Sequence, residues 1–410
     1  MRRLLLALAA AGRACASSGD APRDLGADLG PPEPQDRFGV HLTTAGGDNT
    51  GLLLLVDDVE ANAELDLSRG LTLSPSSTAV GSPFAPDRVF IFDGASPQIT
   101  RYRVGPGDAF EAEETLAFPR FLTPPRFVGP AHFVFIDARR AYLFDPFGEE
   151  LIVWDPVDLV VTGRVPVPTE DVPGPNLLPL PAVQTAQVGT RVIYPISFAN
   201  SFDDAAHPRT LVAVLDTTTD TLETLLVTER CGYLRDVFAT STRDVYLGTD
   251  IFSTAVHVAS EGERAGPSCV LRLDIETLTL DDTPVLVEGD DLGGRPGGSF
   301  AFVADDRAFV RTLDPDALPA DTTLTTLDLT NGAFWRWGFV ANLDPVSFRF
   351  VEGAPLGPAF TRTYTVRDLR LTVDRTPAGG SQLTRIRPDG TRTPGVRTGQ
   401  TILYVFPLRF

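Results

Sequence analysis

The sequence contains no lysine, so all 35 of its basic residues are arginines, and Met1 is its only methionine. A bias toward GC-rich codons is the simplest explanation of both features. The basic residues are too few to balance the 54 acidic ones, and the formal net charge is −19. A nucleic-acid binder needs a basic face to neutralise phosphates, so the charge argues against that class. The sequence also lacks any window of 18 apolar residues, and no transmembrane helix is predicted.

Motifs of common hydrolases are missing as well. HExxH, CxxC and GxSxG do not occur, so a zinc hydrolase or a serine hydrolase has no support. Acidic stretches such as residues 288–291 lack the spacing of known calcium loops, although calcium stays an alternative there. We therefore expect no catalytic residue, no metal site and no cofactor. No two of the four histidines have the short spacing of a shared metal site: they are His41, His132, His207 and His257.

The amino terminus has the layout of a secretory signal. Two arginines precede a nine-residue apolar run over residues 4–12, and small residues surround Cys15. We expect residues 1–15 to be a signal peptide and Cys15 to be the lipidated first residue of a lipoprotein. The alternatives are a cut after Ala16, which discards Cys15 and secretes the chain, and an uncleaved or wrongly assigned start. Residues 16–37 are rich in Pro, Gly and acids, and they predict a disordered tether.

Only two cysteines, Cys231 and Cys269, follow the signal segment. An even number of cysteines in an exported protein indicates a disulfide. We predict that these two residues form one, with two buried thiols as the alternative.

Short strands separated by turn residues dominate residues 38–410, and no 12-residue amphipathic helix is evident. One strand recurs with an average spacing of about 55 residues, and it ends at a polar residue before a turn. This repeat predicts an all-β β-propeller of seven blades, with six or eight blades as alternatives and a stacked solenoid as the main rival. The ends of the repeated strand are Asp57, Arg103, Asp155, Asp216, Asp274, Asp328 and Arg387.

The first and last repeats are unequal. The unit that begins at Phe38 has room for three strands, whereas the last unit has a surplus strand at residues 401–409. We expect this carboxy-terminal strand to pair near the amino-terminal unit and close the ring, because closure removes exposed strand edges. Trp335 and Trp337 alternate along a predicted outer strand, which favours burial between blades over an exposed patch.

The third unit shows four strands most clearly, at residues 132–137, 141–145, 151–155 and 160–167. Residues 133–168 read FVFIDARRAYLFDPFGEELIVWDPVDLVVTGRVPVP. This segment resembles the propeller-like exported proteins encoded beside myxochelin-type siderophore genes in myxobacteria. It is more distantly similar to surface propeller lipoproteins of TonB-dependent siderophore uptake. The resemblance implies export, a lipid anchor, a propeller and a link to iron uptake in a Gram-negative envelope.

Arginines recur in the connectors between predicted blades, where propellers place ligand sites. A guanidinium stacks on rings and makes forked hydrogen bonds, so convergent arginines suit a planar anion. We expect a monomer that binds a small ligand, such as a siderophore, at the outer membrane, in the periplasm or at the cell surface. A scaffold for an envelope receptor protein and a lactonase- or lyase-type enzyme are the alternatives. The candidate ligand-binding residues are Arg120, Arg126, Arg235 and Arg295.

Overall fold

The computed structural model describes residues 36–44, 50–123, 128–169, 177–200, 205–320, 323–359, 361–376 and 378–409. Contacts divide the chain into the units Met1–Pro34 and Gln35–Phe410. The predicted signal peptide, Cys15 and the predicted tether as far as residue 35 lie outside the described residues. The first strand begins at Asp36, two residues before the start expected for the folded domain.

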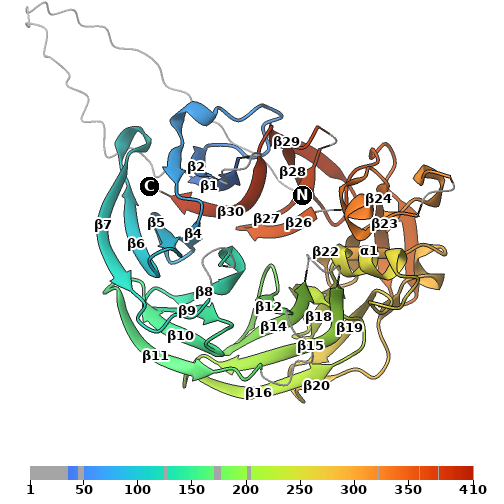
Figure 1. The fold of residues 1–410 in the computed structure, drawn as a ribbon, viewed down its shortest axis with the longest axis horizontal. Coiled ribbons are helices and arrows are strands. Elements are labelled where there is room, and N and C mark those ends of the chain that lie inside the picture. The colour runs from blue at the N-terminus through green and yellow to red at the C-terminus, as the bar shows by residue number, and fades with distance from the viewer. Residues whose placement is uncertain are drawn as a thin grey trace, which may run out of the picture. The chain divides into compact units, whose positions relative to one another are not determined.

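Seven antiparallel sheets form a β-propeller around a central channel, which confirms the predicted fold and the blade number (Figure 1). The first strand of each sheet lies nearest the channel, and the sheets are numbered here as blades 1 to 7. Blade 1 contains β30 (Thr401–Arg409), β1 (Asp36–Thr43), β2 (Gly51–Val56) and β3 (Leu71–Leu73). Blade 2 contains β4 (Ser77–Ser82), β5 (Ala85–Asp93), β6 (Gln98–Val104) and β7 (Phe110–Ala117). Blade 3 contains β8 (Phe133–Asp137), β9 (Arg140–Asp145), β10 (Glu150–Asp155) and β11 (Val160–Pro166).

The remaining blades follow the same plan. Blade 4 contains β12 (Leu178–Pro181), β14 (Arg191–Asn200), β15 (Ala205–Asp216) and β16 (Thr221–Thr228), with β13 (Ala186–Val188) paired to β14. Blade 5 contains β17 (Leu234–Ala239), β18 (Val245–Thr249), β19 (Cys269–Asp274) and β20 (Thr279–Leu280), with β21 (Leu286–Val287) paired to β19. Blade 6 contains β22 (Gly297–Ala304), β23 (Arg307–Leu313), β24 (Trp335–Leu343) and β25 (Val346–Phe350). Blade 7 contains β26 (Thr361–Val366), β27 (Leu369–Arg375), β28 (Ser381–Ile386) and β29 (Arg392–Thr398).

The repeated strand of the sequence is the third strand of each blade except blade 6. The prediction of a strand that ends at Asp328 is wrong, because residues Thr326–Asn331 form the short helix α2. Thr325 and Asp328 make a reciprocal capping box that starts this helix, and Leu327 is 65% exposed rather than buried. The third strand of blade 6 is β24, which carries Trp335 and Trp337. Both indoles are buried, as the sequence predicts.

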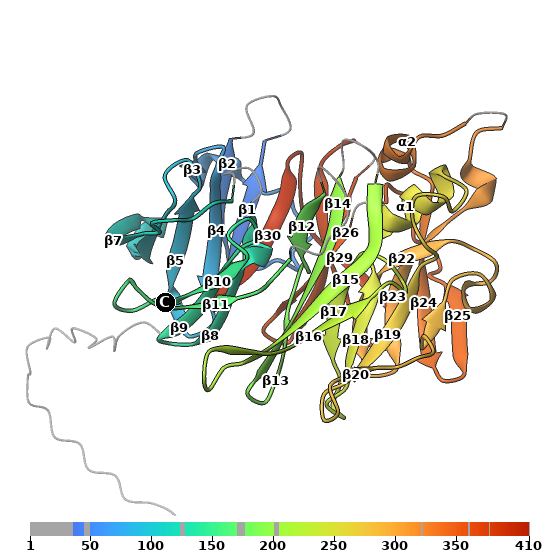
Figure 2. The same cartoon turned by 60° about the horizontal axis from the view of Figure 1, so that its bottom comes forward.

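A second helix, α1 (Ile251–Ala259), connects β18 to β19. Asp250 caps its start by accepting a hydrogen bond from the Phe252 N–H. Ile251 of α1 and Leu329 of α2 belong to one buried cluster, and Figure 2 shows the two helices together at one end of the blades. No helix in the part of the chain that the structure describes is long and apolar enough to cross a membrane.

The ring closes as the sequence predicts. β30 pairs with β1 in an antiparallel ladder and completes the three-stranded amino-terminal unit. Pairing of the two chain ends makes blade 1 equivalent to the others, and it fixes the channel-facing residues of β30 beside those of β26 and β4.

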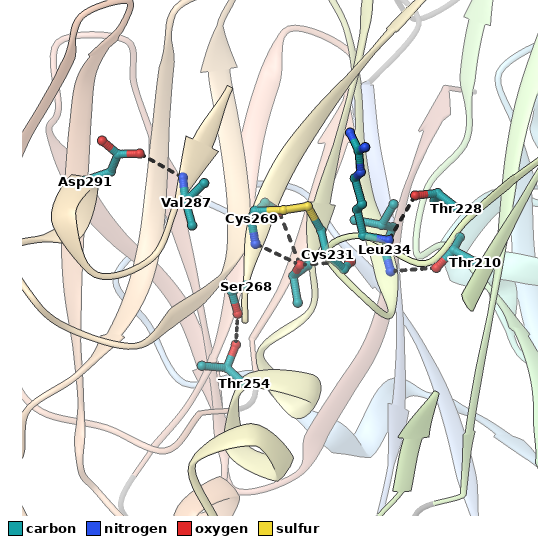
Figure 3. Close-up of a disulfide and its surroundings, with 11 residues drawn as sticks. Thr210, Thr228, Cys231, Leu234, Thr254, Ser268, Cys269, Val287 and Asp291 are labelled. Atoms are coloured by element: carbon teal, nitrogen blue, oxygen red, sulfur yellow. Dashed lines mark hydrogen bonds between the residues drawn. A yellow bond between two sulfur atoms is a disulfide. The ribbon is translucent and has the colours of Figure 1, made fainter. Parts of the chain in front are cut away.

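A disulfide joins Cys231, in the connector from β16 to β17, to Cys269, the first residue of β19 (Figure 3). Their Cα atoms are 5.0 Å apart, and 38 positions separate them in the sequence. The Thr249 hydroxyl lies between the two, where it accepts from the Cys269 N–H at 3.1 Å and contacts the Cys231 carbonyl at 3.3 Å. The bond therefore fixes the entry into blade 5, just before the channel residue Arg235.

Candidate functional site

A cavity of about 450 Å³ opens at one mouth of the central channel. Blades 1, 2, 4, 5 and 7 and the connector that leads into blade 3 contribute to its wall, which places it on the propeller axis rather than between two blades. A neighbouring cavity of about 320 Å³ extends from it toward α1 and α2 and shares Arg235 and Arg362. The main polar and aromatic lining residues are Ser77, Thr78, His132, Arg235, Arg362, Tyr364 and Tyr404.

Arg235 lies on β17, one residue after the strand begins. Its Nε donates to the Pro181 carbonyl at 3.1 Å, and its Nη1 donates to the Tyr233 hydroxyl at 3.2 Å. The guanidinium carbon also lies 5.4 Å from the centre of the Tyr233 ring. Both acceptors are neutral, so these hydrogen bonds orient the guanidinium without neutralising it. Burial lowers the pKa of Arg235, but the nearby charges, among them those of Asp250 and Asp236, outweigh burial and raise it.

Arg362 comes from β26, and its Nη1 donates to the Leu403 carbonyl of β30 at 3.0 Å. Tyr364, two residues along the same strand, donates its hydroxyl to the same carbonyl. Burial raises the pKa of this hydroxyl, and the charges of Arg362 and Arg235 oppose the increase. Two guanidiniums from different blades therefore act on one phenol at the cavity wall.

His132 is the third polar group, and it is only 4% exposed. Its Nδ1 lies 3.1 Å from the Gly129 nitrogen and 3.2 Å from the Gly129 carbonyl oxygen, so either tautomer of the ring makes one hydrogen bond to Gly129. Burial lowers the pKa of His132 to about 4, and the charge of Arg235 adds to the decrease. The ring is thus neutral at pH 7, and its Nε2 is buried with no hydrogen-bond partner among the described residues.

The cavity carries positive charge in a protein of net charge −19. None of its lining residues, all within the described ranges, is an aspartate or a glutamate. Asp236 follows Arg235 in the chain, but its carboxylate accepts from the Phe300 N–H at 2.7 Å. Burial and the nearby charge of Asp250 raise the pKa of Asp236 well above its usual value, which weakens it as a counter-charge for Arg235.

The predicted ligand residues do not all meet here. Of the four arginines, Arg235 lines the cavity. Arg120 is exposed on the connector from β7 to β8, with φ of 72°, and does not line it. Arg295 lies 4.8 Å from the centre of the Phe350 ring in blade 6, outside the channel. Arg126 is outside the described residues.

The sequence interpretation missed Arg362 and His132. Arg362 belongs to the first strand of blade 7 rather than to a connector, so a search of the connectors passes over it. The alternation of polar and aromatic residues in TRTYTV was the available signal, because first strands face the channel. His132 ends the 3-10 turn Pro130–His132 just before β8, although the sequence places it as the first residue of that strand.

No group of three or more His, Cys, Asp or Glu side chains within the described ranges could hold a metal ion. In the acidic stretch at residues 288–291, Asp291 accepts from the Val287 N–H at 2.8 Å and Glu288 from the Gly297 N–H at 3.3 Å. These carboxylates serve backbone donors in a turn. The channel cavity therefore offers donors, a cationic surface and aromatic walls, which suit binding of a flat oxyanion.

No family model and no curated protein match the chain. Among solved structures, a protein from Lactobacillus plantarum is 10% identical, covers 92% of this chain and 99% of its own, and has a TM-score of 0.52. A hypothetical selenium-binding protein from Sulfolobus tokodaii is 11% identical over 93% of each chain, with a TM-score of 0.51. The periplasmic gluconolactonase of Pseudomonas aeruginosa is 13% identical over 90% of this chain and 98% of its own, with a TM-score of 0.49. At such identities the first two likenesses support the propeller fold and nothing more.

Proposed function

We propose that this chain is a binding propeller that takes a small aromatic anion into the mouth of its central channel. The observation that carries the proposal is that one cavity is lined by Arg235, whose hydrogen bonds go to neutral acceptors, and by His132, whose Nε2 is buried without a partner among the described residues. A buried polar group without a partner costs free energy, and a ligand group that forms a hydrogen bond with Nε2 offsets that cost.

The size and electrostatics of the cavity fit this ligand class. About 450 Å³ lies within the range of small-molecule sites. Tyr364 and Tyr404 provide aromatic wall on which a flat ring can pack. The net charge of −19 opposes entry of an anion, but salt at physiological concentration screens exposed charges beyond about 8 Å. The guanidiniums of Arg235 and Arg362 therefore dominate the electrostatic potential at the mouth of the channel.

Catecholates are the ligands to test first, because residues 133–168 resemble propellers associated with siderophore genes. A catecholate combines an aromatic ring with anionic oxygens, and guanidinium groups recognise both. In this proposal the chain is exported, is anchored through Cys15, and delivers a ferric catecholate to an envelope receptor. The anion site itself depends only on the channel residues, so it can be tested without the anchor.

Isothermal titration calorimetry of the chain with 2,3-dihydroxybenzoate and with a ferric catecholate tests the proposal. We expect saturable binding, and at least tenfold weaker binding for Arg235→Met, because the variant loses the charge and keeps most of the side-chain volume. Arg230→Met is the matched control, since Arg230 lies in the connector that leads into β17, faces Asp282 at 3.7 Å and does not line the cavity. Equal affinities for Arg235→Met and wild type would refute the proposal.

A further inference from the structure

A second cavity, of about 480 Å³, lies between blades 6 and 7 and shares no lining residue with the channel cavity described above. One wall comes from β23, β24 and β25, and the other comes from β27, β28 and β29. Four arginines line it. Arg349 is exposed and Arg375 is half-buried, whereas Arg311 and Arg392 lie deeper in the wall.

Arg311 and Arg392 approach the same indole from different blades. Their guanidinium carbons lie 5.0 and 4.4 Å from the centre of the buried Trp337 ring. Arg311 is only 3% exposed, and its Nη2 donates to the Pro358 carbonyl. Its Nε is buried without a hydrogen-bond partner, and no ion pair forms at Arg311 within the described residues.

Among the described lining residues, Asp374 is the carboxylate that lies deep in the cavity beside Arg311 and Arg392. It accepts hydrogen bonds from Arg392 Nη2 and, at 3.1 Å, from the Thr384 hydroxyl. The Nε of Arg392 is also buried, with no hydrogen-bond partner in the described part of the chain. Glu352 and Asp389 line the cavity too, but both are exposed at its mouth, and Asp389 accepts from the Thr391 N–H at 2.8 Å. Two guanidiniums and one carboxylate leave one positive charge in the interior.

We propose that this cavity is a second ligand site, in which Arg311 and Arg392 bind a small oxyanion of the carboxylate or phosphate class. A buried guanidinium without a counter-charge is costly, and the proposed anion supplies that charge. Each guanidinium has an Nε without a hydrogen-bond partner among the described residues, and paired guanidiniums are well suited to bind such an oxyanion. Gly357 keeps room beside the pair, because a Cβ atom there would lie 3.0 Å from Arg311 Nη2. Burial lowers the pKa of Arg311 to about 10, so the group is still charged at neutral pH.

The test is a titration of the full chain with inorganic phosphate and with succinate, against sodium chloride at matched ionic strength. Calorimetry gives the affinity, and the emission of Trp337 reports events in this cavity, since Trp337 lines it. We expect saturable binding of at least one oxyanion with a change in emission that Trp337→Phe removes. Which of the two probes binds more tightly distinguishes a phosphate from a carboxylate ligand.

Variants locate the binding. Arg311→Met should weaken it at least tenfold, whereas Arg307→Gln should leave it within twofold, because Arg307 lies on the same strand but does not line the cavity. Arg311→Lys keeps the charge without the fork, and we expect intermediate affinity. Without ligand, Arg311→Met should unfold at the same temperature as wild type or higher, because an apolar side chain replaces an uncompensated charge.

Three results would overturn the proposal. The first is no binding of either oxyanion by wild type at millimolar concentration. The second is equal affinity of Arg311→Met, or of Arg311→Lys if the methionine variant does not fold. The third is loss of the oxyanion binding in Arg235→Met with retention in Arg311→Met, which would assign it to the channel instead.

Discussion

Val40 of β1 and Val405 of β30 are direct partners in one antiparallel ladder, although they come from opposite ends of the folded chain. Both side chains are fully buried. Their ladder supplies blade 1 with its channel-facing strand, and that strand contributes Leu403 and Tyr404 to the cavity wall. The carbonyl of Leu403 in turn accepts from Arg362. Closure of the propeller and construction of the candidate site are therefore one structural event.

Phe406 on β30 sets a strict size limit on its neighbours at the closure. A Cβ atom at Gly81 would lie 2.2 Å from the Phe406 ring. We expect Gly81→Ala to lower the free energy of unfolding by about 1–3 kcal/mol, because the ring must move in a filled core. Urea denaturation measures the change. In Gly266→Ala the new Cβ meets nothing within 4 Å, so stability should stay the same or rise slightly. If Gly81→Ala were as stable as wild type, the Phe406 ring could move aside without cost, and the expected size limit would be refuted.

The disulfide between Cys231 and Cys269 constrains the unfolded chain over 38 positions. In the chain-entropy model such a loop contributes about 3–4 kcal/mol to stability. We expect dithiothreitol to lower the melting temperature of wild type markedly and to leave that of the Cys231→Ser/Cys269→Ser variant unchanged. Differential scanning calorimetry with and without the reductant gives both values. A reductant effect of equal size in both proteins would mean that the bond does not stabilise the fold.

His41 makes the stability depend on pH. It is 1% exposed on β1, and burial, with a smaller effect of Arg362, lowers its pKa to about 4. An unfolded histidine titrates near 6.5, so the unfolded state takes up this proton first as the pH falls. His41 therefore has no effect above pH 6.5 and removes up to about 3 kcal/mol of stability between pH 6.5 and 4.

We expect His41→Leu to gain stability relative to wild type by about 2–3 kcal/mol between pH 7.5 and pH 4.5. Urea denaturation of both proteins at the two pH values measures this gain, and comparison of the two proteins cancels the contribution of the carboxylates. A stability difference that is the same at both pH values would contradict the low pKa.

Much of the fold could be predicted, because a blade repeats the same local pattern. Where a strand ends in Asp or Arg before a turn, residues adjacent in the sequence determine its end, as at Asp155 and Asp274. The surplus of residues 401–409 was equally visible. Helix α2 was not, because LTTLD alternates like a strand, and only the capping box of Thr325 and Asp328 favours the helix.

The candidate site could be predicted only in part. The sequence predicts Arg235 as a ligand residue because it follows Cys231 and Tyr233 in a segment that resembles a connector. Arg362 and His132 join it through the radial arrangement of blades 7, 3 and 5, which depends on packing between sheets distant in sequence. Arg120 and Arg295 are also arginines of predicted connectors, but neither lines the channel cavity, whereas Arg235 lies on β17, the first strand of blade 5. Local chemistry therefore identifies candidates, and tertiary packing selects among them.

Diffraction from crystals grown with a bromine-labelled 2,3-dihydroxybenzoate tests the channel site most directly. Our account predicts an anomalous bromine peak in the cavity lined by Arg235, His132 and Tyr364, with ligand oxygens within hydrogen-bond distance of the Arg235 guanidinium. Crystals of Arg235→Met treated in the same way should lack this peak. A bromine peak found only outside the channel, or a channel peak that persists in Arg235→Met, would contradict the account.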